Sequence, residues 1–130
     1  MATGEIDHVD LTVSSLERSL PFYTAILQFL GYHKPGSDSV FKKGGTEVAL
    51  EQASPESALK VHDRYAPGLH HLAFTAESRG EVDRLYELLK EMDARILDPP
   101  AVYYQPDYYA VFFADPDGIK LELCHRPGRH

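Results

Sequence analysis

The sequence is poor in cysteine and in basic side chains. Its 130 residues include one cysteine, Cys124, which excludes a disulfide within the chain and a zinc site built from several thiolates. Thirteen lysine and arginine residues stand against 20 acidic ones, and the formal net charge of −7 disfavours a nucleic-acid surface. No apolar run has the length of a membrane span, and the first residues lack a signal-peptide pattern. We therefore expect a cytoplasmic protein that binds neither nucleic acid nor membrane.

The first half of the chain changes from a strand pattern to a helix pattern. Apolar and polar residues alternate over residues 6–13, which predicts a strand with His8, Asp10 and Thr12 on one face. Ser14 and Glu17 then form an S-x-x-E capping box. The helix that follows ends at a glycine and has large side chains at helical spacing, at Leu16, Leu20, Tyr23, Leu27 and Leu30, before Gly31. Short strands are predicted at residues 32–34, 40–43 and 47–52.

The second half repeats this order of elements. Residues 68–76, GLHHLAFTA, have a strand pattern, and Ser78 and Glu81 form a second capping box. The helix that they open has four apolar residues on one face, Val82, Leu85, Leu89 and Met92. Three strands are predicted at residues 95–97, 108–113 and 119–124, with a tight DPDG turn before the last one. Each half therefore has the order of one strand, one helix and three strands.

An alignment of His8 with His71 supports a duplication. It needs no gap, and it matches Tyr23 with Tyr86, which both follow their histidine by 15 residues. Because repeats of this kind decide the fold, we predict an α+β protein of two βαβββ modules, with curved mixed sheets paired around a cavity and helices outside. The first module, a connecting loop and the second module are predicted at residues 1–52, 53–67 and 68–125 of a single domain.

The two adjacent histidines of GLHHLAFTA cannot have the same role if they lie in a strand. Successive side chains of a strand point to opposite faces, so at most one of His70 and His71 points into the cavity. The duplication selects His71, because it is the histidine that aligns with His8. We expect His70 to pack or to face solvent.

The last predicted strand adds a carboxylate to this pair of histidines. Its apolar residues belong to the helix side, which turns Glu122 and Cys124 toward the cavity. His8, His71 and Glu122 are thus predicted to point into one cavity. Two imidazoles and a carboxylate, with coordination positions left open, suit a divalent ion such as Fe(II), Mn(II), Ni(II) or Zn(II).

Three segments in this order resemble the vicinal oxygen chelate superfamily of glyoxalase I, extradiol dioxygenases, fosfomycin-resistance enzymes and bleomycin-resistance proteins. They are DHVDLTVSSLERSLPFY, GLHHLAFTA and FFADPDGIKLEL. The resemblance implies a fold of paired βαβββ modules, and the family's metal ligands match His8, His71 and Glu122. It implies a divalent ion as cofactor, with Ni, Zn, Mn, Fe and Co all admitted by these ligands.

The resemblance also raises two candidates for catalytic residues. Some members of the family have a fourth ligand on the last strand of the first module. Alignment by the pair Ala49-Leu50 places Glu51 at this position, whereas a shift by two residues places Ala49 there. Glu51 is therefore a candidate ligand or base. Tyr108 is predicted to face the cavity and to orient substrate oxygens, while Tyr109 faces the helices.

The function implied by the resemblance is that of a metal-dependent enzyme of the glyoxalase type. It would be an isomerase or lyase acting on a small molecule that chelates the ion through neighbouring oxygens. One alternative is an Fe(II) extradiol-type dioxygenase, and another is a bleomycin-resistance-like protein that binds a small molecule without catalysis. Family members with one pair of modules are usually homodimers. We therefore expect a homodimer in which His8 of one subunit meets His71 and Glu122 of the other.

Overall fold

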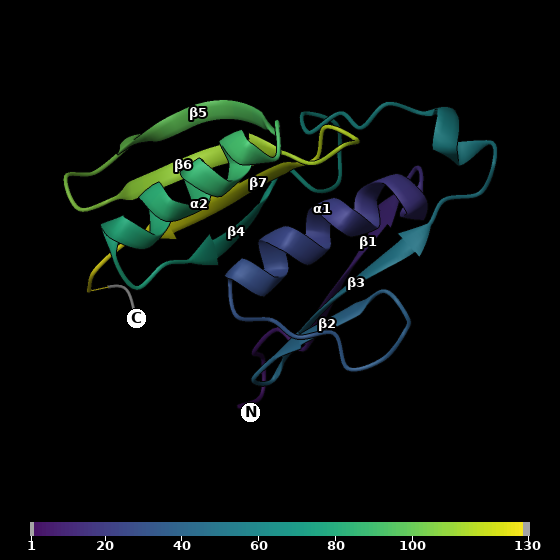
Figure 1. The fold of residues 1–130 in the computed structure, drawn as a ribbon, viewed down its shortest axis with the longest axis horizontal. Coiled ribbons are helices and arrows are strands. Elements are labelled where there is room, and N and C mark those ends of the chain that lie inside the picture. The colour runs from purple at the N-terminus through teal and green to yellow at the C-terminus, as the bar shows by residue number, and fades with distance from the viewer. Residues whose placement is uncertain (1, 129–130) are drawn as a thin grey trace. The chain divides into compact units, whose positions relative to one another are not determined.

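The computed structural model describes residues 2–128, which contain two α-helices and seven strands (Figure 1). The chain divides into two compact units, Met1–Lys60 and Val61–His130. The division lies within the predicted connecting loop, which also contains a short 3₁₀ helix at Ser57–Leu59. Neither α-helix is long and apolar enough among the described residues to span a membrane.

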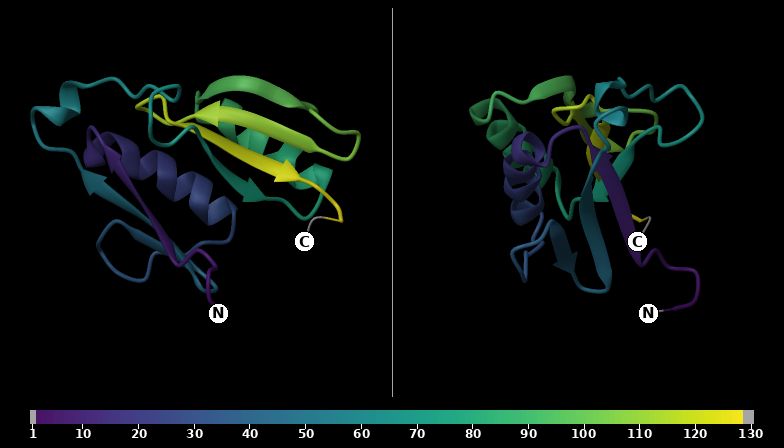
Figure 2. Two further views of the ribbon diagram at one scale, coloured as in Figure 1. Left: turned by 180° about the vertical axis from the view of Figure 1, so that it is seen from behind. Right: turned by 90° about the vertical axis from the view of Figure 1, so that its right-hand side faces the viewer.

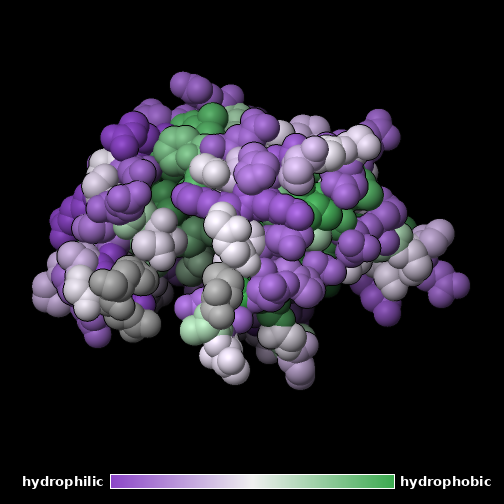
Figure 3. All heavy atoms as spheres, turned by 90° about the horizontal axis from the view of Figure 1, so that it is seen from below, coloured by the Kyte–Doolittle hydropathy of each residue, from purple (hydrophilic) through white to green (hydrophobic). Residues whose placement is uncertain are grey.

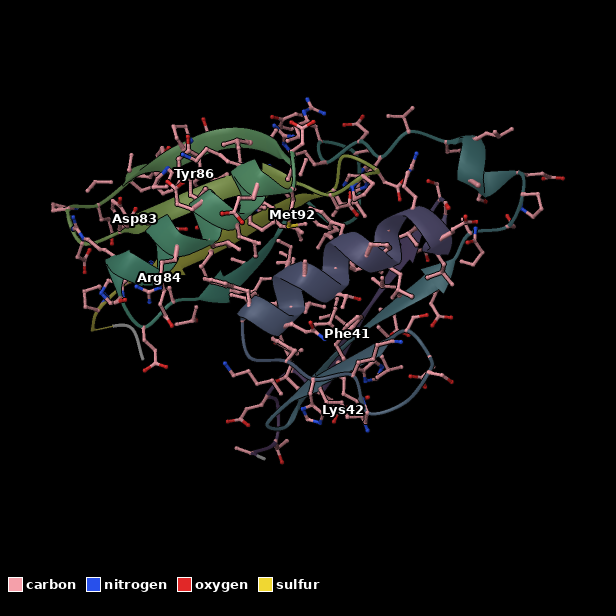
Figure 4. All side chains as sticks on the ribbon, viewed as in Figure 1. Phe41, Lys42, Asp83, Arg84, Tyr86 and Met92 are labelled. Carbon is pink, nitrogen blue, oxygen red and sulfur yellow. The ribbon has the colours of Figure 1, made fainter. Side chains whose placement is uncertain are left out.

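The first unit is a three-stranded mixed sheet with one helix. Its elements are β1 (His8–Val13), α1 (Leu16–Phe29), β2 (Val40–Lys43) and β3 (Thr46–Gln52). The strand order is β1-β3-β2, with β1 parallel and β2 antiparallel to β3. Alternate residues of β2 point to opposite faces of this sheet. Phe41 is fully buried on the side of α1, whereas Lys42 is exposed (Figure 4).

Helix α1 begins one residue later than the capping box predicts. Its N-cap is Ser15, whose hydroxyl accepts a hydrogen bond from the backbone nitrogen of Arg18 at 3.2 Å. The predicted cap, Ser14, instead accepts a bond from the guanidinium of Arg18 at 2.7 Å. Gly31 follows the helix with φ of 92°, as the predicted end requires. The buried apolar face also differs, because it consists of Phe22, Tyr23, Ile26 and Leu27, while Leu16, Leu20 and Leu30 are half-buried.

The strand predicted at residues 32–34 is wrong. This segment makes only an isolated bridge, in which His33 exchanges two backbone hydrogen bonds of 2.9 and 2.8 Å with Lys42. Pro35 follows immediately and has no backbone N–H, so pairing with β2 cannot continue in the usual way. The first unit is therefore a βαββ arrangement with one additional bridge.

The second unit has the complete βαβββ order. Its elements are β4 (Leu72–Thr75), α2 (Arg79–Glu91), β5 (Arg95–Val102), β6 (Tyr109–Ala114) and β7 (Lys120–His125). The strand order is β4-β7-β6-β5, and its first strand again pairs in parallel with its last. Seen from behind, β6 and β7 lie in front of α2, so α2 covers one face of this sheet (Figure 2).

Local signals explain most of the second unit. Ser78 caps α2 by accepting from the nitrogen of Glu81, and Glu81 in turn accepts from the nitrogen of Glu77 at 2.6 Å. β5 is longer than predicted and continues through two prolines, with irregular pairing to β6 between Ile96 and Ala101. β4 is shorter than predicted and begins only after the two histidines.

The core of each unit lies between its helix and its sheet. In the second unit the buried face of α2 consists of the predicted Val82, Leu85 and Leu89, and Met92 follows as a half-buried C-cap. Asp83 and Arg84 are exposed residues of α2 (Figure 4). Figure 3 shows one face of the surface, on which most side chains are hydrophilic and hydrophobic patches lie between them.

Candidate functional site

The sheet registers identify the equivalent positions in the two units. In the first unit Asp10, two residues after the candidate histidine, lies opposite Ala49. In the second unit Ala73, also two residues after its histidine, lies opposite Glu122. Ala49 is therefore the counterpart of Glu122. Glu51 lies two residues beyond this position, so the register corresponds to the second of the two alignments left open by the sequence.

Glu122 is a carboxylate in the middle of the second sheet. It lies on β7, between Ala73 of β4 and Phe112 of β6, and only 1% of its surface is exposed. The hydroxyl of Tyr108 donates a hydrogen bond to its Oε2 atom. A buried carboxylate costs free energy unless charges or hydrogen bonds compensate it. The groups around its second oxygen therefore have to account for the burial of this charge.

That second oxygen, Oε1, lies close to an imidazole. Nε2 of His71 is 3.1 Å away, within ion-pair distance if the ring is protonated, yet Oε1 has no hydrogen-bond partner among the described residues. Two ligands about 2.1 Å from one ion lie about 3.0 Å apart at neighbouring octahedral positions and about 3.4 Å apart at tetrahedral ones. The separation and the unpartnered oxygen therefore fit two donors that share a divalent ion.

The prediction that a strand runs through His70 and His71 is wrong, whereas His70 is exposed and packs against neighbouring rings as expected. Both residues precede β4, so the alternation of a strand does not apply to them. Their Nδ1 atoms lie 2.7 Å apart, within hydrogen-bond distance. Their rings meet edge to face, with centroids 4.9 Å apart. The pKa of His70 is lowered by desolvation and then by the positive charges of His71, Lys120 and Arg64.

The other candidate histidine, His8, lies in the first unit. It is the first residue of β1, it is exposed, and its Nδ1 atom is 2.8 Å from a carboxylate oxygen of Asp7. This hydrogen bond, followed by the charge of Asp10, raises the pKa of His8. The bond occupies Nδ1 and leaves Nε2 as the nitrogen that can bind a ligand.

The structure brings together some of the predicted site residues and not others. His71, Glu122 and Tyr108 are adjacent in the second unit, whereas His8 and the exposed Glu51 belong to the first. Over residues 2–128, no group of three His, Cys, Asp or Glu side chains is placed to hold a metal ion. The participation of His8 and Glu51 remains a prediction.

The face of the second sheet that contains Glu122, opposite to α2, also contains a thiol and aromatic rings. Cys124 packs with Ala110 and Phe112, and Tyr108 lies against this cluster, as predicted for the cavity-facing side of the strand. Tyr109 faces the other way and donates a hydrogen bond to Asp83 of α2. Burial and the charge of Glu122 raise the pKa of Cys124 to about 11. The thiol therefore stays protonated near neutrality in the metal-free protein.

Tyr108 is expected to titrate later than an ordinary tyrosine. Burial, followed by its hydrogen bond to Glu122 and the charge of that carboxylate, raises its pKa well above the usual range. We predict that Tyr108→Phe leaves the tyrosinate absorbance gained below about pH 11 unchanged, because this phenol is still protonated there. Spectrophotometric titration tests this. A loss of one-eighth of the signal from the eight tyrosines would contradict it.

Sequence reasoning missed two neighbours of the candidate ligands. Asp7 and His70 each precede a candidate histidine by one residue and contact its Nδ1 atom. Their adjacency in the sequence was the available signal. It could not be used for His70, because a strand was assumed to run through this segment.

The chain matches the Glyoxalase/Bleomycin resistance protein/Dioxygenase superfamily over residues 5–123. It is 30% identical over 123 residues to the metallothiol transferase FosB of Lysinibacillus sphaericus, covering 95% of this chain and 83% of the relative. It is 28% identical over 121 residues to the catechol-2,3-dioxygenase of Bacillus subtilis, covering 91% of this chain and 40% of that enzyme.

Solved structures agree with the sequence comparison. A glyoxalase-like protein of Bacillus halodurans superposes with a TM-score of 0.84 at 35% identity, and the match covers 95% of this chain and 96% of the other. The superfamily match spans nearly the whole chain, and the element order, the parallel pairing in each unit and this superposition agree with it. The chain therefore belongs to the Glyoxalase/Bleomycin resistance protein/Dioxygenase superfamily.

Proposed function

We propose that the protein is a metal-dependent enzyme acting on a small molecule with two neighbouring oxygens. His8, His71 and Glu122 would hold a divalent ion. The observation that carries this proposal is the unpartnered Oε1 atom of buried Glu122, 3.1 Å from Nε2 of His71. A bound ion would supply Lewis-acid stabilisation of the charge that develops on the substrate oxygens.

Tyr108 supports Glu122 in this proposal rather than reacting with the substrate. Its hydroxyl donates to Oε2 and so leaves Oε1 as the oxygen that is free to bind the ion. The raised pKa keeps this phenol protonated, which makes it a hydrogen-bond donor and not a base. Cys124 is likewise protonated near neutrality in the metal-free protein.

The reaction that we propose is an isomerisation or a lyase step of the glyoxalase type, with Glu51 as the candidate base. Glu51 is exposed at the end of β3, and its carboxylate has no described partner that would prevent proton transfer. The register supports three protein ligands rather than four, because Ala49 is the counterpart of Glu122. Three ligands leave positions open for both substrate oxygens.

The same three ligands favour a second candidate function. Two histidines and one carboxylate are the set used by non-haem Fe(II) oxygenases. The similarity to a catechol dioxygenase supports this alternative, although the chain spans 40% of that enzyme. An extradiol oxygenase would consume oxygen with a catechol substrate only when loaded with Fe(II).

Metal titration of the chelator-treated protein tests the proposal. We expect saturable binding of Co(II), Mn(II), Ni(II) or Zn(II), with loss of this binding in His8→Ala and in His71→Ala. His33→Ala is the matched control, because this exposed histidine lies outside the proposed site. Failure to bind any of these ions or Fe(II) would refute the enzyme and favour a binding protein without catalysis. Oxygen uptake with catechol by the Fe(II) form would favour the oxygenase.

Subunit mixing tests whether the site is shared in a homodimer. If His8 of one subunit meets Glu122 of the other, a heterodimer of His8→Ala and Glu122→Gln contains one intact site. Random exchange of subunits then restores about a quarter of the wild-type metal sites. Neither variant alone should bind the ion. No recovery after demonstrated subunit exchange would show that each site lies within one chain.

A further inference from the structure

Each candidate ligand histidine is contacted at Nδ1 by the side chain that precedes it in the sequence. For His8 the contact is a carboxylate oxygen of Asp7 at 2.8 Å, and for His71 it is Nδ1 of His70 at 2.7 Å. The two pairs lie in different units at the start of equivalent strands. The repetition suggests a shared function of the preceding residue.

The proton on an imidazole decides which nitrogen can bind a metal ion. A neutral ring has one N–H and one lone pair, and the hydrogen bond made by one nitrogen selects the state of the other. The carboxylate of Asp7 can only accept, so it selects Nδ1–H in His8 and leaves the lone pair on Nε2. The contact between His70 and His71 involves two identical atoms and could run in either direction.

The proposed ion decides this direction. If His70 donated, His71 would carry its proton on Nε2, beside the carboxylate oxygen Oε1 at 3.1 Å, and this nitrogen would have no lone pair for the ion. If His71 donates instead, Nε2 carries a lone pair, and both Nε2 and the unbonded Oε1 are free to bind one cation.

We propose that Asp7 and His70 are positioning residues that hold His8 and His71 by Nδ1 and present Nε2 to the ion. This inference rests on the proposed metal site. The ring of His70 is itself held edge to face by Tyr65 at 5.7 Å, and the guanidinium of Arg64 stacks over Tyr65 at 4.9 Å. His70 thus packs against Tyr65 as well as against His71.

Two substitutions separate the hydrogen bond from the packing of His70. His70→Phe keeps an aromatic ring against Tyr65 and His71 but removes the acceptor. His70→Asn removes the ring but places an amide oxygen where it can accept from Nδ1 of His71. If the hydrogen bond matters, the asparagine variant is close to wild type and the phenylalanine variant is not. If only packing matters, the order is reversed.

The first measurement is made on the metal-free protein. Nitrogen-15 chemical shifts report which imidazole nitrogen carries the proton, and they need neither a metal nor a substrate. Because His70 accepts from Nδ1 in this proposal, we expect a larger share of the Nδ1–H form of His71 in wild type and in His70→Asn than in His70→Phe. The same form of His71 in wild type and His70→Phe would overturn the inference, even if the protein binds metal as proposed.

The second measurement is the dissociation constant of Zn(II) or Co(II) by chelator competition. Loss of a hydrogen bond behind a ligand histidine typically weakens metal binding about 10–100-fold, which we expect for His70→Phe. Asp7→Ala should weaken metal binding more than Asp10→Asn does. The second substitution removes a negative charge near His8 but no hydrogen bond to its Nδ1 atom. Equal effects of Asp7→Ala and Asp10→Asn would overturn the role of Asp7. A wild type that binds no metal would refute the proposed function, while the nitrogen shifts would still test His70.

Discussion

Glu122→Gln is expected to abolish metal binding while the protein remains folded. The substitution keeps the shape of the side chain, and its amide oxygen can still accept from Tyr108. It removes the negative charge and the free oxygen 3.1 Å from His71. Loss of a protein ligand should exceed the loss of a supporting residue, so we expect the dissociation constant for Zn(II) or Co(II) to rise by more than about 100-fold.

The same substitution should leave the metal-free protein as stable as wild type, or more stable. The carboxylate is 1% exposed and accepts one hydrogen bond, and the imidazole 3.1 Å from its other oxygen has no charge in the neutral form of His71 proposed above, so the negative charge is poorly compensated. A glutamine has no charge to bury, and its NH₂ group can donate to Nε2 of His71. Urea denaturation with chelator present measures the free energy of unfolding of both proteins.

Glu91→Gln provides the matched control, because it makes the same chemical change at an exposed residue of α2. It should alter neither metal binding nor stability. Unchanged metal affinity in Glu122→Gln would show that this carboxylate is not a ligand of the metal ion. A large loss of stability in metal-free Glu122→Gln would show instead that the charge of Glu122 stabilises the fold.

Strong local patterns predicted most of the fold. The helix caps, the glycine after α1 and the periodic apolar residues located both helices and most strands within one or two residues. The bridge at His33 was mistaken for a strand because residues 32–34 alone contain no signal against pairing. Pairing stops at that point because of the proline that follows.

The candidate site was predicted less completely because it depends on where strands begin. Simple alternation predicts Glu122 and Tyr108 on one face of the sheet, and their hydrogen bond agrees with this, although Tyr108 lies one residue before β6. The position of β3 against β1 could not be deduced from apolar residues, since Ala49 and Glu51 lie on the same face. The contact between His70 and His71 could not be predicted, because alternation along a strand places them on opposite faces and β4 begins only after them.

Phe113→Ala should cause the largest loss of stability and should act through the opposite face of the same sheet. Phe113 lies on β6, is fully buried, and has the strand parity of Tyr109, which bonds to Asp83 of α2. Truncation leaves a cavity between β6 and α2 that a packed core cannot fill. We expect the free energy of unfolding to fall by about 3–5 kcal/mol in urea denaturation.

Phe29→Ala is the control for this change, because Phe29 is 36% exposed at the end of α1. It should cost no more than about 0.5 kcal/mol. Phe113 points to the opposite face of the sheet from Glu122, which pairs with Phe112, so folded Phe113→Ala should keep the metal affinity of wild type at low temperature. Glu122→Gln should show the reverse, with affinity lost and stability kept. If both variants lost both properties together, the two faces of this sheet would not be independent, and metal binding could not be assigned to the face that contains Glu122.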